Sequence, residues 1–234
     1  MIGSRSLQCT LVMELERTAP LQRDIREGWF LLARMALYAT VVTLAVHCVV
    51  VAADSGYASV VAQEFGPIEI LQAILAGLGF IGFVVAARAG DETAAVAEIV
   101  AAGLLFMTIR ELDYPLDLAL GQGSYKYFNT PVVAWALYVI VRSRKILPAQ
   151  VAAFVRSPAG YLAMFGLFFA VMYGQVIGQK ELWLGLSPER ETMMFVKRTV
   201  EEISEMPGYF LLAFASLEAV LRARQRRRHA LGMR

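Results

Sequence analysis

One stretch of the sequence decides the fold: VEEISEMPGYFLLAFASLEAVLR, residues 200–222. It places three glutamates, Glu201, Glu202 and Glu205, directly before an apolar run from Met206 to Leu221. A bilayer core requires about 20 helical residues, so a helix that crosses a membrane here must draw its acidic turn to the membrane boundary. The stretch therefore predicts a membrane-spanning helix with carboxylates at one end, and the glutamates become the leading functional candidates.

The composition of the chain is that of a membrane protein. Hydrophobic residues make up 58% of its 234 residues and charged residues only 18%, whereas soluble domains carry about 25% charged residues. We therefore expect an all-α, polytopic integral membrane protein. The preference of basic residues for the cytoplasmic side and their attraction to anionic lipid headgroups explain the basic tail from Arg222 to Arg228. Membrane lipids are thus expected partners, and nucleic acid is not.

The apolar stretches together predict a bundle of six transmembrane helices. The run 131–141 is too short to cross a membrane alone, so we extend it in both directions to form the fourth span. The expected organisation is a cytoplasmic juxtamembrane segment 1–28, a six-helix membrane domain 29–224 and a basic cytoplasmic tail 225–234. The predicted spans are 29–53, 68–87, 93–110, 127–145, 158–179 and 200–222.

The distribution of Lys and Arg supports the count of six. With alternating sides, fifteen of these residues fall on the side of the two termini and six on the other, while Arg34 lies inside the first span. Basic residues concentrate on the cytoplasmic side of membrane proteins. Both termini are therefore predicted to be cytoplasmic, in an inner membrane of the bacterial type.

A group of polar residues falls at the outer end of the predicted bundle. An ionisable side chain at membrane depth costs about 3 kcal/mol on insertion scales, so such residues face the bundle interior, pair with one another or line a water path. We therefore predict a carboxylate-rich binding site at the outer ends of the helices. Its candidate residues are Glu69, Gln72, Arg110, Glu111, Gln175, Glu201, Glu202 and Glu205.

The glutamates of the opening stretch are spaced to interact. Glu205 lies three and four residues after Glu202 and Glu201, so the three side chains neighbour one another on a helix. Carboxylates this close repel unless a cation, an arginine or a proton lies between them. Pro207 lacks a backbone amide hydrogen, and we expect it to break the helix just below the acids.

A structural interpretation of the same residues stands beside the functional one. Acidic residues stabilise the first turn of a helix by their interaction with the helix dipole. Lys197 and Arg198 stand four residues before Glu201 and Glu202 and are spaced to form ion pairs with them. In this alternative the acids only start a helix.

A second charged set lies near the predicted cytoplasmic face. Arg34 and Glu98 lie inside their spans, and Arg142 and Glu218 lie near the ends of theirs. Opposite charges at matched depth indicate buried pairing, which we interpret as structural.

The fifth span carries small residues at a regular spacing. Gly166, Ala170, Gly174 and Gly178 recur every four residues along one face. Such spacing lets two helix backbones approach closely. We expect this face to pack against another helix, of this chain, of a second copy in a homo-oligomer or of a membrane-protein partner.

The residues that bind common cofactors are scarce. His47 and His229 are the only histidines, and Cys9 and Cys48 the only cysteines. Haem and zinc sites usually take several such ligands. No cofactor is predicted, haem and zinc are disfavoured, and a monovalent or divalent cation is compatible with the carboxylates.

Three functions fit these features. The first is a small transporter or channel linked to a cation or proton through the outer carboxylates. The second is a non-catalytic subunit or assembly factor of a membrane complex, and the third is a membrane enzyme that acts on a lipid headgroup. A continuous polar path favours the first, an outward small-residue face the second, and an outer pocket open sideways to lipid the third.

Overall fold

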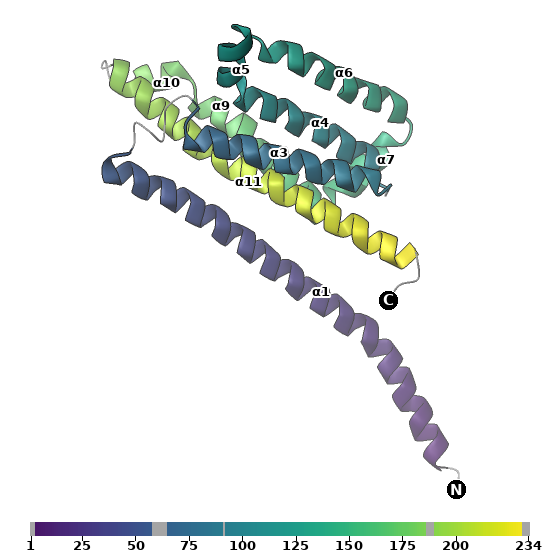
Figure 1. The fold of residues 1–234 in the computed structure, drawn as a ribbon. Coiled ribbons are helices and arrows are strands. Elements are labelled where there is room, and N and C mark those ends of the chain that lie inside the picture. Colours follow the sequence, from purple (N-terminus) through teal and green to yellow (C-terminus); the bar gives the residue numbers. More distant parts are fainter. Residues whose placement is uncertain (1–2, 58–64, 91, 186–189, 231–234) are drawn as a thin grey trace. The chain divides into compact units, whose positions relative to one another are not determined.

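The structure is a computed structural model that describes residues 3–57, 65–90, 92–185 and 190–230. Within these ranges the structure describes the backbone alone before position 25 and at 53, 175, 184, 190–192 and 229–230. The described residues form helices and turns, and no strand occurs among them. The elements are α1 (Gly3–Ala52), the π-helical turn η1 (Ala53–Tyr57), α3 (Pro67–Arg88), α4 (Ala94–Glu111), α5 (Asp113–Leu120), α6 (Tyr125–Ser143), α7 (Leu147–Val155), α8 (Pro158–Leu167), the π-helical segment η2 (Phe168–Tyr173), α9 (Gly174–Ile177), α10 (Lys180–Leu184) and α11 (Arg190–Ala230) (Figure 1).

The chain divides into two compact units, residues 1–44 and residues 45–234. The first unit is built from the N-terminal part of α1, so the predicted juxtamembrane segment 1–28 is helical from Gly3 onward. The second unit holds the rest of the chain, including all the helices from α3 to α11. The site described below lies entirely within this second unit.

Among the described residues, three helical segments are long and apolar enough to cross a membrane: Ile25–Ala52, Pro67–Arg88 and Met193–Arg228. A fourth is added if α7 and the stretch Pro158–Tyr173, which meet at 90°, count as one broken span. These helices indicate a helical membrane protein. The predicted spans 93–110 and 127–145 also correspond to helices, α4 and α6, but α4 holds three charged residues among its 18.

The core of the second unit is made by α3, α4, α8 and α11, with contributions from α7 and η2. This core combines small side chains, such as Ala76 and Ala215, with large ones, such as Phe83, Leu104 and Leu212. Small residues let membrane helices approach closely.

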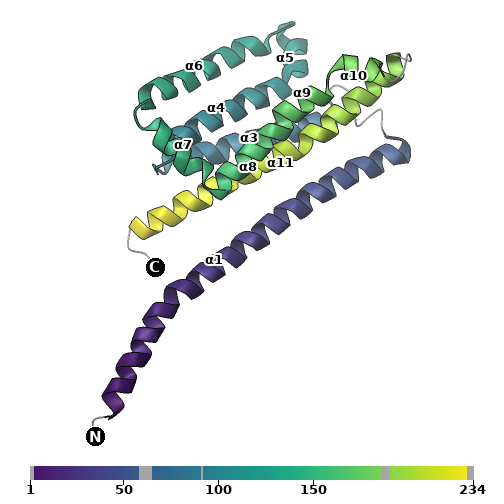
Figure 2. The same cartoon turned by 180° about the vertical axis from the view of Figure 1, so that it is seen from behind.

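The small-residue face of the fifth predicted span packs against α11 (Figure 2). A methyl group added to Gly166 would lie 2.9 Å from the Gly208 carbonyl oxygen, and one added to Gly174 would lie 2.8 Å from Glu205 Cδ. Gly178 faces Glu201 in the same way, and Ala170, which is fully buried, contacts Gly208. The face predicted to meet another helix therefore meets a helix of the same chain.

Two expectations about the acidic stretch are wrong. Helix α11 runs from Arg190 to Ala230 through Pro207 without a break. A proline removes only one backbone hydrogen bond, and neighbouring helices often stabilise a helix around a proline in membrane proteins; here Gly208 packs tightly against Ala170. Because α11 begins at Arg190, Glu201 lies well inside the helix, and the acids do not occupy its first turn.

We expect Gly208→Ala to destabilise the protein. Its new methyl group would lie 2.6 Å from the Gly166 carbonyl oxygen and 2.7 Å from Ala170 Cβ. Overpacking of this kind costs about 1–3 kcal/mol, and the thermal unfolding midpoint in detergent should fall. Gly103→Ala is the matched control, because no atom lies within 4 Å of the added methyl group, and it should leave the midpoint unchanged or raise it. Equal midpoints for wild type and Gly208→Ala would contradict the close packing.

Candidate functional site

Four glutamates from three helices lie near one another at one end of the second unit. Glu69 comes from α3, Glu111 from the end of α4, and Glu202 and Glu205 from α11. Glu202 interacts electrostatically with Glu69 and Glu111, and Glu205 interacts with Glu202 and Glu111. We call these four residues the carboxylate cluster.

Glu111 is held by the neighbouring polar groups of α4 and α11. The hydroxyl group of Tyr209, a residue with no exposed surface, donates a hydrogen bond of 2.5 Å to Glu111 Oε1. The same oxygen lies 4.0 Å from Arg110 Nε. The Arg110 guanidinium also interacts electrostatically with Glu202 and Glu205, so it is a cation shared by several carboxylates.

Gln72 links α3 to α11 beside Glu202. Its side-chain amide is completely buried and donates a hydrogen bond of 3.3 Å to the backbone carbonyl oxygen of Glu202. Gln72 Oε1 and Glu202 Oε2 are buried without a hydrogen-bond partner among the described residues. The link therefore leaves acceptor atoms available for a proton donor or a cation.

Glu205 is the most unusual member of the carboxylate cluster. Its side chain is 2% exposed, and Oε1 finds no hydrogen-bond partner among the residues that the structure describes. The carboxylate lies over Gly174, where the missing side chain provides its space. A buried carboxylate without a partner is expensive in an apolar environment, because desolvation of a charge costs several kcal/mol.

Ion pairs surround the cluster at its rim. Arg198 Nη2 lies 2.7 Å from Glu69 Oε1, and the backbone amide of Phe65 donates to Glu69 Oε2. Lys197 Nζ lies 2.7 Å from Glu201 Oε2, which confirms the ion pair predicted from their four-residue spacing. Glu201 therefore belongs to the rim and not to the buried cluster.

The balance of charge in the cluster is negative. Four carboxylates share two arginines, Arg110 and Arg198, in their immediate surroundings. No group of three or more His, Cys, Asp or Glu side chains among the described residues is arranged to hold a metal ion. The carboxylates are thus close enough to repel one another but do not converge on a single point. Protons can neutralise their charges one at a time.

The other residues predicted for the outer site are placed differently. Gln175 belongs to α9, but its side chain lies outside the described residues. His47, one of the two histidines, is exposed on α1. Residue Tyr209 was not among the predicted site residues; its position four after Glu205 on the same helix was the signal that could have found it.

The charged residues predicted for the opposite end are also partly brought together. Arg142 Nη2 lies 2.9 Å from Glu98 Oε2, so α6 and α4 are joined by an ion pair. Glu218 is buried on α11, and Arg34 lies on α1 within the first unit. That Arg34 and Glu218 each pair with an opposite charge at matched depth stays a prediction.

A further ion-pair group at this end was not predicted. Glu92, in the turn between α3 and α4, accepts from Arg222 at 2.8 Å and from Arg226 at 2.5 Å. The hydrogen bond from Arg226 is the main cause that lowers the pKa of Glu92. The two arginines are four residues apart on α11, which places both on one side of the helix. Part of the basic tail thus fixes the end of α11 to this turn.

An apolar layer separates the two polar ends. It includes the buried side chains of Leu104, Ala170 and Leu212. The polar residues of the carboxylate cluster therefore end against a packed core. Comparison with protein-family models, curated proteins and solved structures finds no significant match for this chain.

We expect Tyr209→Phe to lower the free energy of unfolding by about 1–3 kcal/mol, the cost of leaving a buried acceptor such as Glu111 without its donor. Chemical unfolding in detergent at neutral pH measures the change. Tyr161→Phe is the control, because Tyr161 is 52% exposed, and it should leave stability unchanged. A Tyr209→Phe variant as stable as the wild type would show that the short hydrogen bond contributes nothing.

Proposed function

We propose that this chain is a six-span protein of a bacterial-type cytoplasmic membrane, with both termini cytoplasmic, whose carboxylate cluster binds and releases protons or a small cation as part of transport. The observation that carries the proposal is the buried carboxylate of Glu205 beside Glu111 and Glu202, whose Oε1 has no hydrogen-bond partner among the described residues. A proton on one of these groups removes both a buried charge and a repulsion.

The six-span topology is supported by two observations. Helices occupy all six stretches of the sequence that were expected to span, including α4 and α6. The Lys and Arg residues are divided fifteen to six between the two sides that this topology defines, as the positive-inside rule requires for cytoplasmic termini.

Transport through this site requires helix movement. The apolar layer of Leu104, Ala170 and Leu212 closes the cluster on the side of the core. Two features beside the cluster support such movement: Pro207 removes one backbone hydrogen bond of α11, and the facing segment η2 is π-helical. π-helical segments occur frequently at functional sites.

The subunit hypothesis has less support. It relied on the face of Gly166, Gly174 and Gly178 being free for a partner, but that face is occupied by α11. A membrane partner would have to use the opposite face, where Phe165 and Met172 are exposed. Such apolar exposure is ordinary for a helix in contact with lipid.

Cysteine accessibility tests the proposed topology. In a variant without Cys9 and Cys48, we expect single cysteines at Leu120 and Leu182 to react with a membrane-impermeant thiol reagent added outside intact cells. Both positions are exposed, at 63% and 50%, and the proposed topology places both on the outer side of the membrane. A cysteine at Ile146, exposed by 54%, should react only after the cells are opened. Labelling of Leu120→Cys and Leu182→Cys from opposite sides would rule out six spans.

Proton flux tests the function. Liposomes containing the wild-type protein should take up protons in response to an imposed pH gradient, and Glu205→Gln should slow this uptake at least about tenfold, because glutamine keeps the side-chain volume and cannot exchange a proton. A pH-sensitive dye inside the liposomes measures the rate. A parallel sodium gradient identifies a cation as the transported species.

Glu181→Gln is the matched control. Glu181 lies on the short helix α10, outside the carboxylate cluster, so its variant should show the wild-type rate. Equal rates for Glu205→Gln and wild type would remove the carboxylate cluster from transport. A wild-type protein that moves neither protons nor sodium would favour the subunit hypothesis.

A further inference from the structure

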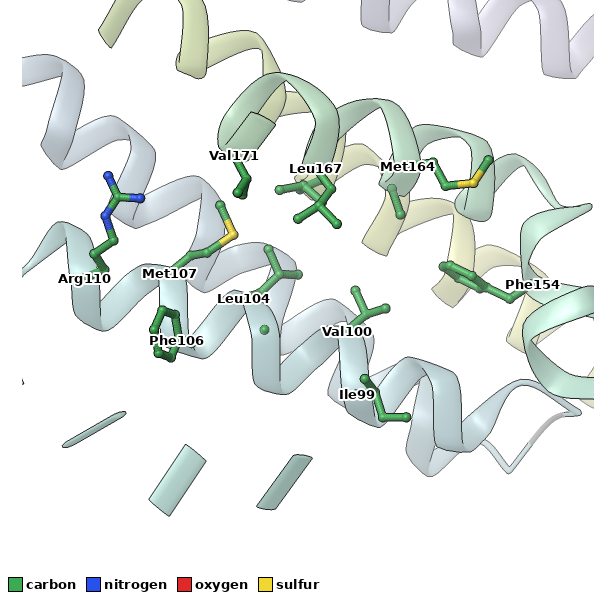
Figure 3. Close-up of a pocket in the computed structure, with 13 residues that line it drawn as sticks. Ile99, Val100, Leu104, Phe106, Met107, Arg110, Phe154, Met164, Leu167 and Val171 are labelled. Atoms are coloured by element: carbon green, nitrogen blue, oxygen red, sulfur yellow. The ribbon is translucent and has the colours of Figure 1, made fainter. Parts of the chain in front are cut away.

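A long apolar groove lies next to the carboxylate cluster on the outside of the core (Figure 3). Its volume is about 470 Å³, and its walls are formed by α4 on one side and by α8 and η2 on the other. Leu104 and Met107 line the first wall, Met164 and Leu167 the second. We call this space the α4–α8 groove.

The α4–α8 groove has the length of a hydrocarbon chain and not of a compact ligand. The residues of α4 that line it run from Ile99 to Arg110, which at 1.5 Å per residue corresponds to about 16 Å. Its rim is accessible from the surface of the unit, since Phe106, Met164 and Leu167 are 39%, 44% and 51% exposed. A chain can therefore enter from the side.

One end of the α4–α8 groove carries its only charged lining residue, Arg110 (Figure 3). The Arg110 side chain is 41% exposed and meets Glu111 only at 4.0 Å. No hydrogen bond among the described residues uses its guanidinium as donor. Arginine presents five donors that match the geometry of a phosphate group. A guanidinium at the end of an apolar channel, with its Glu111 partner only at 4.0 Å, thus complements an amphiphile with an anionic head.

We propose that the α4–α8 groove binds one chain of a membrane phospholipid whose phosphate group contacts Arg110. The position of Arg110 in the last turn of α4 puts the guanidinium where that helix leaves its apolar stretch and α5, which carries Asp113 and Asp117, follows. The site goes beyond the proposed proton or cation site, because its walls contain none of the four cluster glutamates.

The groove differs from the remaining lipid-facing surface. On α3, Ile74, Leu78 and Ile81 are more than half exposed. They do not line this groove, whose end carries Arg110. Lipid that merely surrounds the protein would contact both faces equally. A specific site predicts saturable binding that depends on the groove residues.

Gly103 offers a way to fill the groove without disturbing the fold. It lines the groove, and a Cβ atom added there would have no packing neighbour within 4 Å. Gly103→Leu therefore places a hydrocarbon group in the space of the lipid chain. Leu78→Phe is the matched control, because it enlarges an exposed apolar residue on α3.

Native mass spectrometry of the delipidated protein in detergent, titrated with dioleoylphosphatidylglycerol, tests the proposal. We expect one tightly bound lipid on the wild type and on Leu78→Phe. Gly103→Leu and Arg110→Gln should each weaken this binding at least about tenfold, since one loses the chain site and the other a charge-assisted pair. Dioleoylglycerol, which lacks the phosphate, should bind the wild type as weakly as phosphatidylglycerol binds Arg110→Gln.

Three results would overturn the proposal: unchanged binding to Gly103→Leu, equal binding of dioleoylglycerol and the phospholipid, or displacement of the phospholipid by an equal concentration of oleic acid, which would identify a fatty acid as the occupant. If Gly103→Leu fails to fold, Met164→Trp fills the groove from its exposed rim and must give the same loss. The lipid titration measures binding without a proton gradient, so a failure of the transport proposal and a failure of the lipid site are distinguishable.

Discussion

The contact between the backbones of α11 and the α8–η2–α9 stretch is the constraint on which the second unit depends. At Gly166 and Gly208 the two helices approach so closely that neither position has room for a methyl group. This approach holds Leu212 in the core and brings Glu205 against Gly174. Larger residues at these points would separate the helices, and both the core and the acidic site would lose one of their walls.

The burial of the acids follows from that packing. Each of the three helices α3, α4 and α11 supplies polar groups at the same end of the unit, so no single helix has to satisfy them alone. Tyr209 supplies a donor to Glu111, and Gln72 supplies one to the backbone at Glu202. No hydrogen bond among the described residues reaches Glu205 Oε1, although Arg110 interacts with this carboxylate electrostatically. This buried acid is the basis of the proposed proton or cation site.

The sequence predicted the helical membrane class, whereas its expectations for the local structure of the acidic stretch were wrong. Apolar run lengths reveal candidate spans, and glutamates within a span are conspicuous because they are costly. The predicted helix break at Pro207 was wrong because the rule that proline breaks a helix considers one helix alone. It leaves out the stabilising contacts of the helices packed around the proline. The ion pair between Arg198 and Glu69 joins residues far apart in the chain, and sequence spacing reveals only pairs within one helix, such as Lys197 with Glu201.

The α4–α8 groove was not predicted for a similar reason. Its two walls come from separate helices, and one of its lining residues, Gly103, would have no packing neighbour within 4 Å of an added Cβ atom. A glycine in an apolar helix normally indicates close helix contact, as Gly166 does. Only the three-dimensional arrangement distinguishes a glycine that admits a neighbouring helix from one that leaves a space open.

The π-helical segment η2 explains how a four-residue repeat can face one partner over its whole length. In a regular α-helix, residues four apart drift about 40° around the axis, so the step from Gly166 to Gly178 would accumulate about 120°. A π turn takes more residues and therefore rotates less per residue, and η2 lies in the middle of the repeat. It acts as a phase correction that keeps Gly174 and Gly178 turned toward α11. Conversion of η2 to regular α-helix would rotate α9 around its axis. Gly174, which lies against the Glu205 carboxylate, would then turn away from it.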